Sequence, residues 1–291
     1  MAKFNIGDVE KILFLAFPAA DAMPGDRFGL LAGDRNTPVS RIAISLDQTV
    51  PMINAAATAG CNLLVSHHPA FWNTPDSFVA APSAAISNGA AIWAAGCARV
   101  AAVNSAADEA NYILPANTAA IGVALLAMHT NLDCAPSCAS MLLEPVGLKY
   151  TKALKPNGNG SLGQLAIPTT TEEYTSMLAL EELAHRYQCK FGAVAKVWGN
   201  AKKPLHTIAI CSGGAGEVIP EVIAAKADCF VTGELRHHEA LYLQDCDIAI
   251  IELGHDVSEL PYRFALQDAL ISAGIDSSDI TILEPSASWW N

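Results

Sequence analysis

The sequence has no apolar run long enough to cross a membrane. Hydrophobic residues make up 52% of the 291-residue chain, but many are alanine and the runs are short, whereas a membrane-spanning helix needs about 20 consecutive apolar residues. The apolar patch Ile12–Phe17 lies beside Asp8, Glu10 and Lys11 and precedes no convincing cleavage site, so no secretory signal is indicated. We therefore expect a soluble, cytoplasmic protein with no membrane partner.

Paired cysteines and clustered basic residues are also missing. The eight cysteines include no Cys-x-x-Cys pair and several lie in apolar runs, which suits a reducing cytosol better than a disulfide framework. The net charge is −12 and the longest basic cluster is the pair Lys202 and Lys203. A nucleic acid would be repelled and is not expected as a partner. A small anionic substrate remains compatible, because bound metal ions can reverse the local field.

Strand-like and helix-like patterns alternate in two parts of the chain. In the first part the expected order is a strand, a helix and a strand: Arg41–Leu46, Val50–Ala59 and Asn62–Val65. In the second part the expected order is a strand, a helix and two strands: Thr207–Cys211, Val218–Lys226, Cys229–Val231 and Ile248–Leu253. Such units force parallel strands with right-handed crossovers. We predict a two-lobed α/β fold with mixed or mostly parallel sheets flanked by helices.

The middle of the chain is read as a boundary region. The stretch Thr151–Pro168 is rich in Lys, Asn, Gly and Pro and is interpreted as a loop or lobe boundary. A helix is predicted from Thr170, whose spacing to Glu173 fits a capping box, to about Tyr187. The predicted lobes are residues 1–133 with 250–291, which carry the metal site, and residues 134–249.

Six of the eight histidines follow strand-like runs: His67, His68, His129, His237, His238 and His255. The carboxyl ends of parallel strands face one crevice, so residues there converge even when they are distant in sequence. We therefore predict one imidazole-rich pocket at the carboxyl ends of the strands.

Carboxylates at helical spacing strengthen this prediction. Asp133 lies four residues after His129, and Glu259 four residues after His255, so each pair lies on one face of a helical turn. A helix beginning near Ser258 would aim His255 and Glu259 at the crevice. Nitrogen and oxygen ligands without thiolate suit Zn²⁺, Fe²⁺, Mn²⁺ or Co²⁺.

Five ligands exceed what one four-coordinate ion with open water positions needs, which favours two ions about 3.5–4 Å apart bridged by a carboxylate. The predicted ligands share strand-end positions and include Glu259 as the bridge: His67, His68, Asp133, His255 and Glu259. Taken singly, a His-His pair is more often a solvated turn, and a His-x-x-x-Glu pair often decorates a helix surface.

Three further features are less specific. The Gly-rich loop at residues 212–216 follows a strand and precedes a helix, so it either cradles a phosphate or forms a tight turn. His237 and His238 serve as general acid or base, or make hydrogen bonds at a helix start. Cys134 and Cys138 are either reactive or packed, and packing is favoured.

Four segments resemble a known family: Leu-Leu-Val-Ser-His67-His68-Pro69, His129-Thr-Asn-Leu-Asp133, Val-Thr-Gly233-Glu-Leu-Arg-His237-His238 and Gly254-His255-Asp-Val-Ser-Glu259. The family is the dinuclear metal-centre proteins known as GTP cyclohydrolase I type 2 homologues, or NGG-one-interacting-factor-three-like proteins. The resemblance spans nearly the whole chain in the same order. Near the N-terminus the sequence departs from it, with Arg27-Phe28-Gly29-Leu30 where the family usually has Asn-x-Gly-Leu or Asn-Gly-Leu.

The resemblance implies a two-lobed α/β protein with a metal pair on the five predicted ligands, and a ring-shaped homohexamer with sites facing an inner cavity. It favours a metal-dependent hydrolase that presents a metal-bridging hydroxide to a nucleotide or pterin. His129, His237 and His238 are the candidates for proton transfer. The alternative is a protein without enzymatic activity that stores or delivers metal, or a regulatory ligand-binding protein.

Overall fold

The structure, a computed structural model, describes residues 4–70, 122–169 and 177–285. By internal contacts the chain divides into two compact units. Unit 1 contains residues 1–18, 24–129 and 266–291, and unit 2 contains residues 19–23 and 130–265. Residues 250–265 thus belong with the middle of the chain, whereas the sequence-based lobes group them with the N-terminal lobe. Whether the lobes are independent domains stays a prediction.

Unit 1 is built on a five-stranded sheet with the order β1-β4-β3-β2-β11. Its strands are β1 (Gly29–Ala32), β2 (Ile42–Ser45), β3 (Leu63–Ser66), β4 (Ala124–Ala127) and β11 (Ile280–Ile282). Among the described strands of this sheet, β1 pairs antiparallel with β4 and the other pairs are parallel. Every residue of β2, β3 and β4 is buried, as expected for parallel strands covered on both faces.

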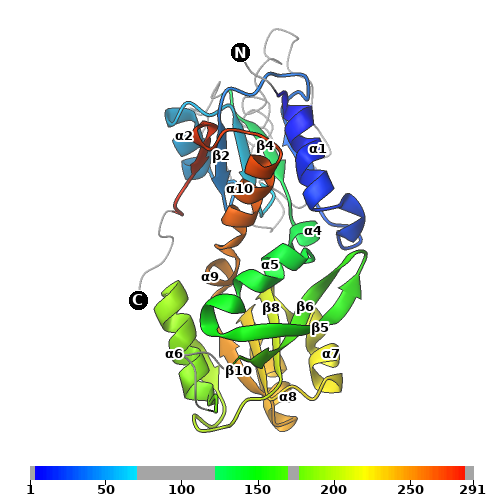
Figure 1. The fold of residues 1–291 in the computed structure, drawn as a ribbon, viewed down its shortest axis with the longest axis vertical. Coiled ribbons are helices and arrows are strands. Elements are labelled where there is room, and N and C mark those ends of the chain that lie inside the picture. The colour runs from blue at the N-terminus through cyan, green and yellow to red at the C-terminus, as the bar shows by residue number, and fades with distance from the viewer. Residues whose placement is uncertain (1–3, 71–121, 170–176, 286–291) are drawn as a thin grey trace, which may run out of the picture. The chain divides into compact units, whose positions relative to one another are not determined.

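The helices of unit 1 include α1 (Ile6–Ala16) and α2 (Val50–Thr58), and the short 3-10 helix η6 (Ser277–Asp279) precedes β11 (Figure 1). Met52 and Ile53 of α2 pack in one hydrophobic cluster with Leu64 of β3 and Leu125 of β4. The order β2, α2, β3 confirms the first predicted strand-helix-strand unit.

Unit 2 is built on a six-stranded mixed sheet with the order β5-β6-β8-β9-β10-β7. The strands are β5 (Leu148–Asn157), β6 (Gly160–Pro168), β7 (Lys196–Trp198), β8 (Ile208–Gly214), β9 (Cys229–Glu234) and β10 (Ala249–Glu252). The central strands β8, β9 and β10 are parallel, and β5, β6 and β7 pair antiparallel. The predicted second run of strand, helix, strand, strand is confirmed.

Short helices connect and cover the strands of unit 2. They are η1 (Ala19–Asp21), α4 (Thr130–Asp133), α5 (Pro136–Met141), η4 (Glu144–Val146), α6 (Leu180–Phe191), η5 (Gly216–Val218), α7 (Ile219–Ala224), α8 (His237–Asp245) and α9 (His255–Glu259). Helix α10 (Tyr262–Ser272) begins in unit 2, and the division between the units falls within it.

The core of unit 2 has two layers that follow the alternation of strand residues. Ile210 and Val231 face one cluster with Leu183 of α6, while Phe230 faces a second cluster with Leu243 of α8. Helices therefore cover both faces of the sheet. Together the two sheets confirm the predicted α/β class.

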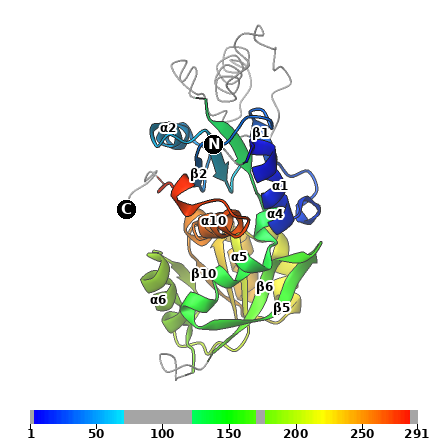
Figure 2. The same ribbon diagram turned by 45° about the horizontal axis from the view of Figure 1, so that its top comes forward.

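The prediction of a loop at Thr151–Pro168 is wrong. These residues form most of the antiparallel hairpin β5–β6, the two neighbouring green arrows of Figure 2. The hairpin turn contains Gly158, which has a positive φ of 55° and follows Asn157. An Asn-Gly pair between two extended runs is a strong hairpin signal. The composition indicated a turn correctly, but the turn occupies only the centre of the stretch.

Two helix starts also differ from prediction. Helix α6 begins at Leu180, and the predicted capping box at Thr170 and Glu173 lies outside the described residues. Helix α9 begins at His255 instead of near Ser258, so its first residue is the predicted ligand itself. Among the described residues, no helix is both long and apolar enough to span a bilayer.

Candidate metal site

Three histidines gather at one end of the unit 1 sheet. His67 and His68 follow β3, and His129 comes two residues after β4, its parallel neighbour. The ring centroid of His67 lies 4.7 Å from that of His68 and 5.2 Å from that of His129. One ring nitrogen from each lies within 4.8 Å of the others, a spacing that can hold a metal ion. Neighbouring parallel strands end at one sheet edge, which brings these side chains together.

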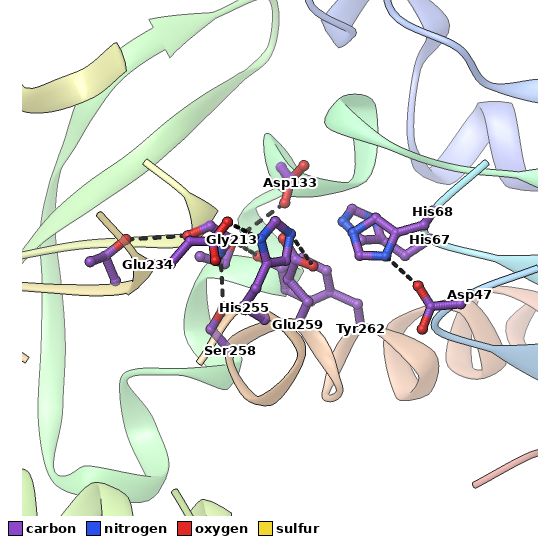
Figure 3. A network of polar contacts seen from close by, with 12 residues as sticks. Asp47, His67, His68, Asp133, Gly213, Glu234, His255, Ser258, Glu259 and Tyr262 are labelled. Carbon is purple, nitrogen blue, oxygen red and sulfur yellow. Dashed lines mark hydrogen bonds and ion pairs between the residues drawn. The ribbon is translucent and has the colours of Figure 1, made fainter. Parts of the chain in front are cut away.

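The Nδ1 atoms of His67 and His68 are held by oxygen atoms of unit 1. His67 Nδ1 lies 3.0 Å from the Met128 carbonyl oxygen, and His68 Nδ1 lies 2.8 Å from Asp47 Oδ1 (Figure 3). A carbonyl or carboxylate oxygen only accepts, so Nδ1 carries the proton in each contact. In the neutral imidazole Nε2 then has the lone pair, as in histidines that bind metals.

His129 is held in the same manner by an acid from the loop before β1. Its Nδ1 lies 2.5 Å from Asp26 Oδ1, and the side chain of Asp26 is almost fully buried. Sequence reasoning missed Asp26, because 103 residues separate the two and no spacing rule links them.

Three acidic or imidazole side chains predicted as ligands belong to unit 2. Asp133 ends α4, while His255 and Glu259 begin and end α9. His255 Nε2 lies 3.3 Å from Glu259 Oε2, so the predicted four-residue spacing does bring this pair together. Glu259 is only 3% exposed, and a carboxylate buried to this extent requires compensating interactions.

His255 repeats the orientation seen in unit 1. Its Nδ1 lies 3.1 Å from Oε1 of Glu234, the last residue of β9 (Figure 3). Glu234 was not predicted as a site residue. It lies inside the quoted Val-Thr-Gly-Glu segment, and its place at a strand end is the signal that could have identified it.

The Gly-rich end of β8 leaves room for Glu259. Gly213 has φ +60°, and a Cβ atom added there would overlap Glu259 Oε1 and lie 3.3 Å from His255 Nε2. The backbone N–H of Gly213 donates to Ser258 Oγ at 2.9 Å. This amide is therefore committed within the protein. Its geometry favours the tight-turn interpretation over a phosphate cradle at this position.

Asp133 has a polar neighbour on β8. Ser212 Oγ lies 3.3 Å from Asp133 Oδ1 and 2.6 Å from the hydroxyl oxygen of Tyr262. Burial raises the pKa of Tyr262 well above its usual value, with the charge of Asp133 as the next largest cause, so this hydroxyl keeps its proton.

His237 and His238 lie apart from these groups. Both are exposed at the start of α8, and the His237 ring is 5.8 Å from the ring of Trp198. Among the described residues, neither belongs to a group of side chains spaced to hold a metal ion. The structure thus supports the predicted convergence for His67, His68 and His129 within unit 1, and for His255 with Glu259 within unit 2.

Cys134 and Cys138 follow Asp133 closely in the sequence, and both are buried. Burial raises the pKa of Cys134 to about 11, and it raises that of Cys138 further. A thiol with a raised pKa is a poor nucleophile near neutral pH. Packing is the role that the structure supports for both.

The donor set fits a metal such as Zn²⁺ or Fe²⁺. Four histidines have Nδ1 against a carbonyl or carboxylate oxygen, and buried or half-buried carboxylates accompany them. This arrangement of ligand, hydrogen-bond partner and burial is typical of protein metal sites. The described chain therefore contains groups of His, Asp and Glu that can bind metal.

Comparison with known proteins identifies the family of the chain. The chain belongs to the Duf34/NIF3 (NGG1p interacting factor 3) family, whose model matches residues 4–89 and 101–284. A protein of Streptomyces coelicolor named GTP cyclohydrolase 1 type 2 homolog is 26% identical over 263 residues, which cover 89% of this chain and 82% of the relative. A protein of the same name from Clostridium acetobutylicum is 24% identical over 258 residues, covering 87% of this chain and 85% of the relative.

Solved structures share the fold. A hypothetical protein of Staphylococcus aureus superimposes with a TM-score of 0.74 at 21% identity, covering 99% of both chains. Reduced HcgD from Methanocaldococcus jannaschii gives a TM-score of 0.67 at 19% identity, covering 96% of both chains. At these identities the likeness establishes the two-sheet α/β fold.

Proposed function

We propose that this chain binds two divalent metal ions and uses them to hydrolyse a small-molecule substrate. The proposed ligands include Glu259 as the bridge: His67, His68, Asp133, His255 and Glu259. The observation that carries the proposal is the common orientation of four histidines, whose Nδ1 atoms all face acceptor oxygens. The motifs shared with the Duf34/NIF3 family support the same assignment.

When bound, two such ions would supply Lewis acidity and lower the pKa of a water molecule toward neutrality. The proton transfer that must accompany hydrolysis is assigned to His129. Because its Nδ1 donates to Asp26, Nε2 is the nitrogen that accepts or returns a proton. Asp26 orients the ring and would stabilise its charged form. His237 and His238 stay predicted acid/base residues without geometric support.

A nucleotide or a pterin is the proposed substrate. The support is the name shared by the curated relatives, GTP cyclohydrolase 1 type 2 homolog. A cyclohydrolase opens a ring by adding water to a polarised carbon, and this suits the donor set described above.

The first test is metal content by elemental analysis of purified protein. We expect about two ions per wild-type chain, as for the two-metal sites of hydrolases, and a sharp loss in His68→Ala and Glu259→Gln. His185→Ala is the matched control, because His185 is exposed on α6. Wild-type protein that stays metal-free after anaerobic loading with Zn²⁺, Mn²⁺ or Fe²⁺ would refute the proposal.

The second test is turnover of nucleotides, pterins and phosphoesters by the metal-loaded protein. We expect hydrolysis that is lost in His129→Ala while the metal content is retained. A metal-loaded protein that turns over none of these substrates would contradict the hydrolase and leave metal storage or ligand binding as the function.

We also propose that the chain works in the cytoplasm as a ring-shaped homohexamer. The family resemblance supports the ring, and the free cysteines of the described residues suit a reducing compartment. Native mass spectrometry tests the assembly against a chain mass of 30.6 kDa. A monomer or dimer at micromolar concentration would contradict the hexamer without affecting the metal assignment.

A further inference from the structure

Asp133 lies at the end of a chain of hydroxyl groups from two distant elements. Ser212 Oγ of β8 is 3.3 Å from Asp133 Oδ1, and the Tyr262 hydroxyl at the start of α10 is 2.6 Å from Ser212 Oγ. Ser212 is 79 positions from Asp133 in the sequence and 50 positions from Tyr262. Figure 3 shows Asp133 and Tyr262 in this network. Three elements of unit 2 therefore meet at one carboxylate.

The proton positions in this chain are determined by chemistry. An ionised carboxylate only accepts hydrogen bonds, so Ser212 donates its single hydroxyl proton to Asp133. Ser212 can then only accept from Tyr262, and the Tyr262 hydroxyl must be the donor. The chain runs from Tyr262 to Ser212 to Asp133, with a short bond of 2.6 Å between the two hydroxyls and a longer one of 3.3 Å to the carboxylate.

We infer that Tyr262 and Ser212 are positioning residues that fix the Asp133 carboxylate for metal binding. This rests on the proposed function, in which Asp133 is a ligand. Partners of ligating carboxylates in the outer shell set the orientation of the ligand. The hydroxyl of Tyr262 acts on Asp133 through Ser212.

Ser212 and Tyr262 are both held in place by surrounding structure. The residue before Ser212, Cys211, pairs with Thr232 of β9, and the residue after it, Gly213, donates its N–H to Ser258 Oγ. Tyr262 is only 3% exposed. A donor fixed on both sides restricts the carboxylate more than a mobile surface hydroxyl would.

A second buried tyrosine in unit 2 shows what an ordinary structural role looks like. Tyr187 is fully buried and donates its hydroxyl to the backbone carbonyl of Leu142 at 2.9 Å. That bond satisfies a buried hydroxyl with no link to a proposed ligand. Tyr187→Phe is thus a matched control for Tyr262→Phe, since each removes one buried hydroxyl from the same unit.

The experiment measures metal dissociation constants by competition with a chromogenic chelator, using Zn²⁺ and Co²⁺ on the full-length protein. We expect Ser212→Ala and Tyr262→Phe each to weaken binding at one site by about 10-fold or more, the effect usual for loss of an outer-shell partner. Tyr187→Phe should leave both constants within about 2-fold of wild type. Ser212→Thr, which keeps a hydroxyl, should restore affinity relative to Ser212→Ala.

Two further readouts separate positioning from a general structural effect. The visible absorption bands of bound Co²⁺ should shift in Ser212→Ala and Tyr262→Phe but not in Tyr187→Phe. In the double variant Ser212→Ala/Tyr262→Phe, the tyrosine change should add nothing, because the chain is already broken at Ser212.

The outcomes are distinguishable from failure of the proposed function. Wild-type protein that binds no metal overturns both proposals. Wild-type protein that binds two ions, with unchanged affinity and Co²⁺ spectra in Ser212→Ala and Tyr262→Phe, overturns the positioning role alone. Additive losses in the double variant also overturn it, because independent effects contradict a single chain.

Discussion

Replacing Gly213 by alanine tests whether the Glu259 carboxylate binds metal where the structure places it. A Cβ atom added at residue 213 would lie much closer to Glu259 Oε1 than 3.0 Å, the lower limit of real Cβ contacts. It would also lie 3.3 Å from His255 Nε2. The carboxylate must therefore move by about 1 Å, far beyond the roughly 0.2 Å tolerance of metal–ligand distances. Glu259 is buried, so few other positions are open to it.

Gly192→Ala is the matched control. Gly192 has φ +68°, close to the +60° of Gly213, and nothing lies within 4 Å of an added Cβ. Both variants pay the strain of a left-handed alanine, about 1 kcal/mol of unfolding free energy. Only Gly213→Ala should also weaken metal binding, by at least about 100-fold, the upper end for loss of an outer-shell partner.

The assay pairs chelator competition for metal affinity with urea unfolding of the metal-free protein. Two variants that both fold, with a metal defect confined to Gly213→Ala, would support the placement of Glu259. Wild-type metal affinity in Gly213→Ala would refute it. An equal metal defect in Gly192→Ala would show that backbone strain, and not contact with the carboxylate, controls binding.

Three other predictions concern the outer shell, the metal and the thiols. Asp47→Ala removes the acceptor of His68 Nδ1 and should weaken metal binding by about 10-fold or more. Asp268→Ala, at an exposed residue of α10, is the control and should leave the metal dissociation constant unchanged. Removing metal with a chelator should lower the thermal midpoint, since a ligand at 100 times its Kd adds about 2.7 kcal/mol; an unchanged midpoint in calorimetry would contradict metal binding by the folded state. The pKa of Cys134 is raised to about 11, so Cys134 stays a neutral thiol as the pH rises through 9. Mass spectrometry should therefore find iodoacetamide on the exposed Cys189 well before it appears on Cys134. Equal rates of modification would contradict the burial of Cys134.

The sequence predicted those parts of the site that local patterns encode. His67 and His68 follow a buried strand directly, and His255 and Glu259 have helical spacing, so their convergence within each unit follows from periodicity. The orienting acids have no such pattern. Asp47 approaches His68 from the loop after β2, and nothing in the sequence between them marks the contact.

The fold was predicted where strands are buried and missed where they are amphipathic. Strands β2 and β3 each have three consecutive apolar residues before a final buried serine, which is typical of parallel strands covered on both faces. Strand β5 lies at the edge of its sheet and contains three lysines and a proline. This composition is typical of loops, so the extended conformation was not predicted. Lysine and proline are common on edge strands because they discourage pairing with other chains.

The pairing of β11 with β2 has a consequence for synthesis of the chain. Ile280–Ile282 adds to the sheet beside Ile42–Ser45, and Arg41 bonds Thr281 across a separation of 240 residues. The sheet of unit 1 cannot acquire β11 until the ribosome has released the chain beyond Ile282. Until then β2 presents an unpaired edge, which makes the nascent chain prone to association. Premature termination before Ile280 would therefore remove β11 and destabilise the sheet of unit 1, whose other strands were synthesised earlier.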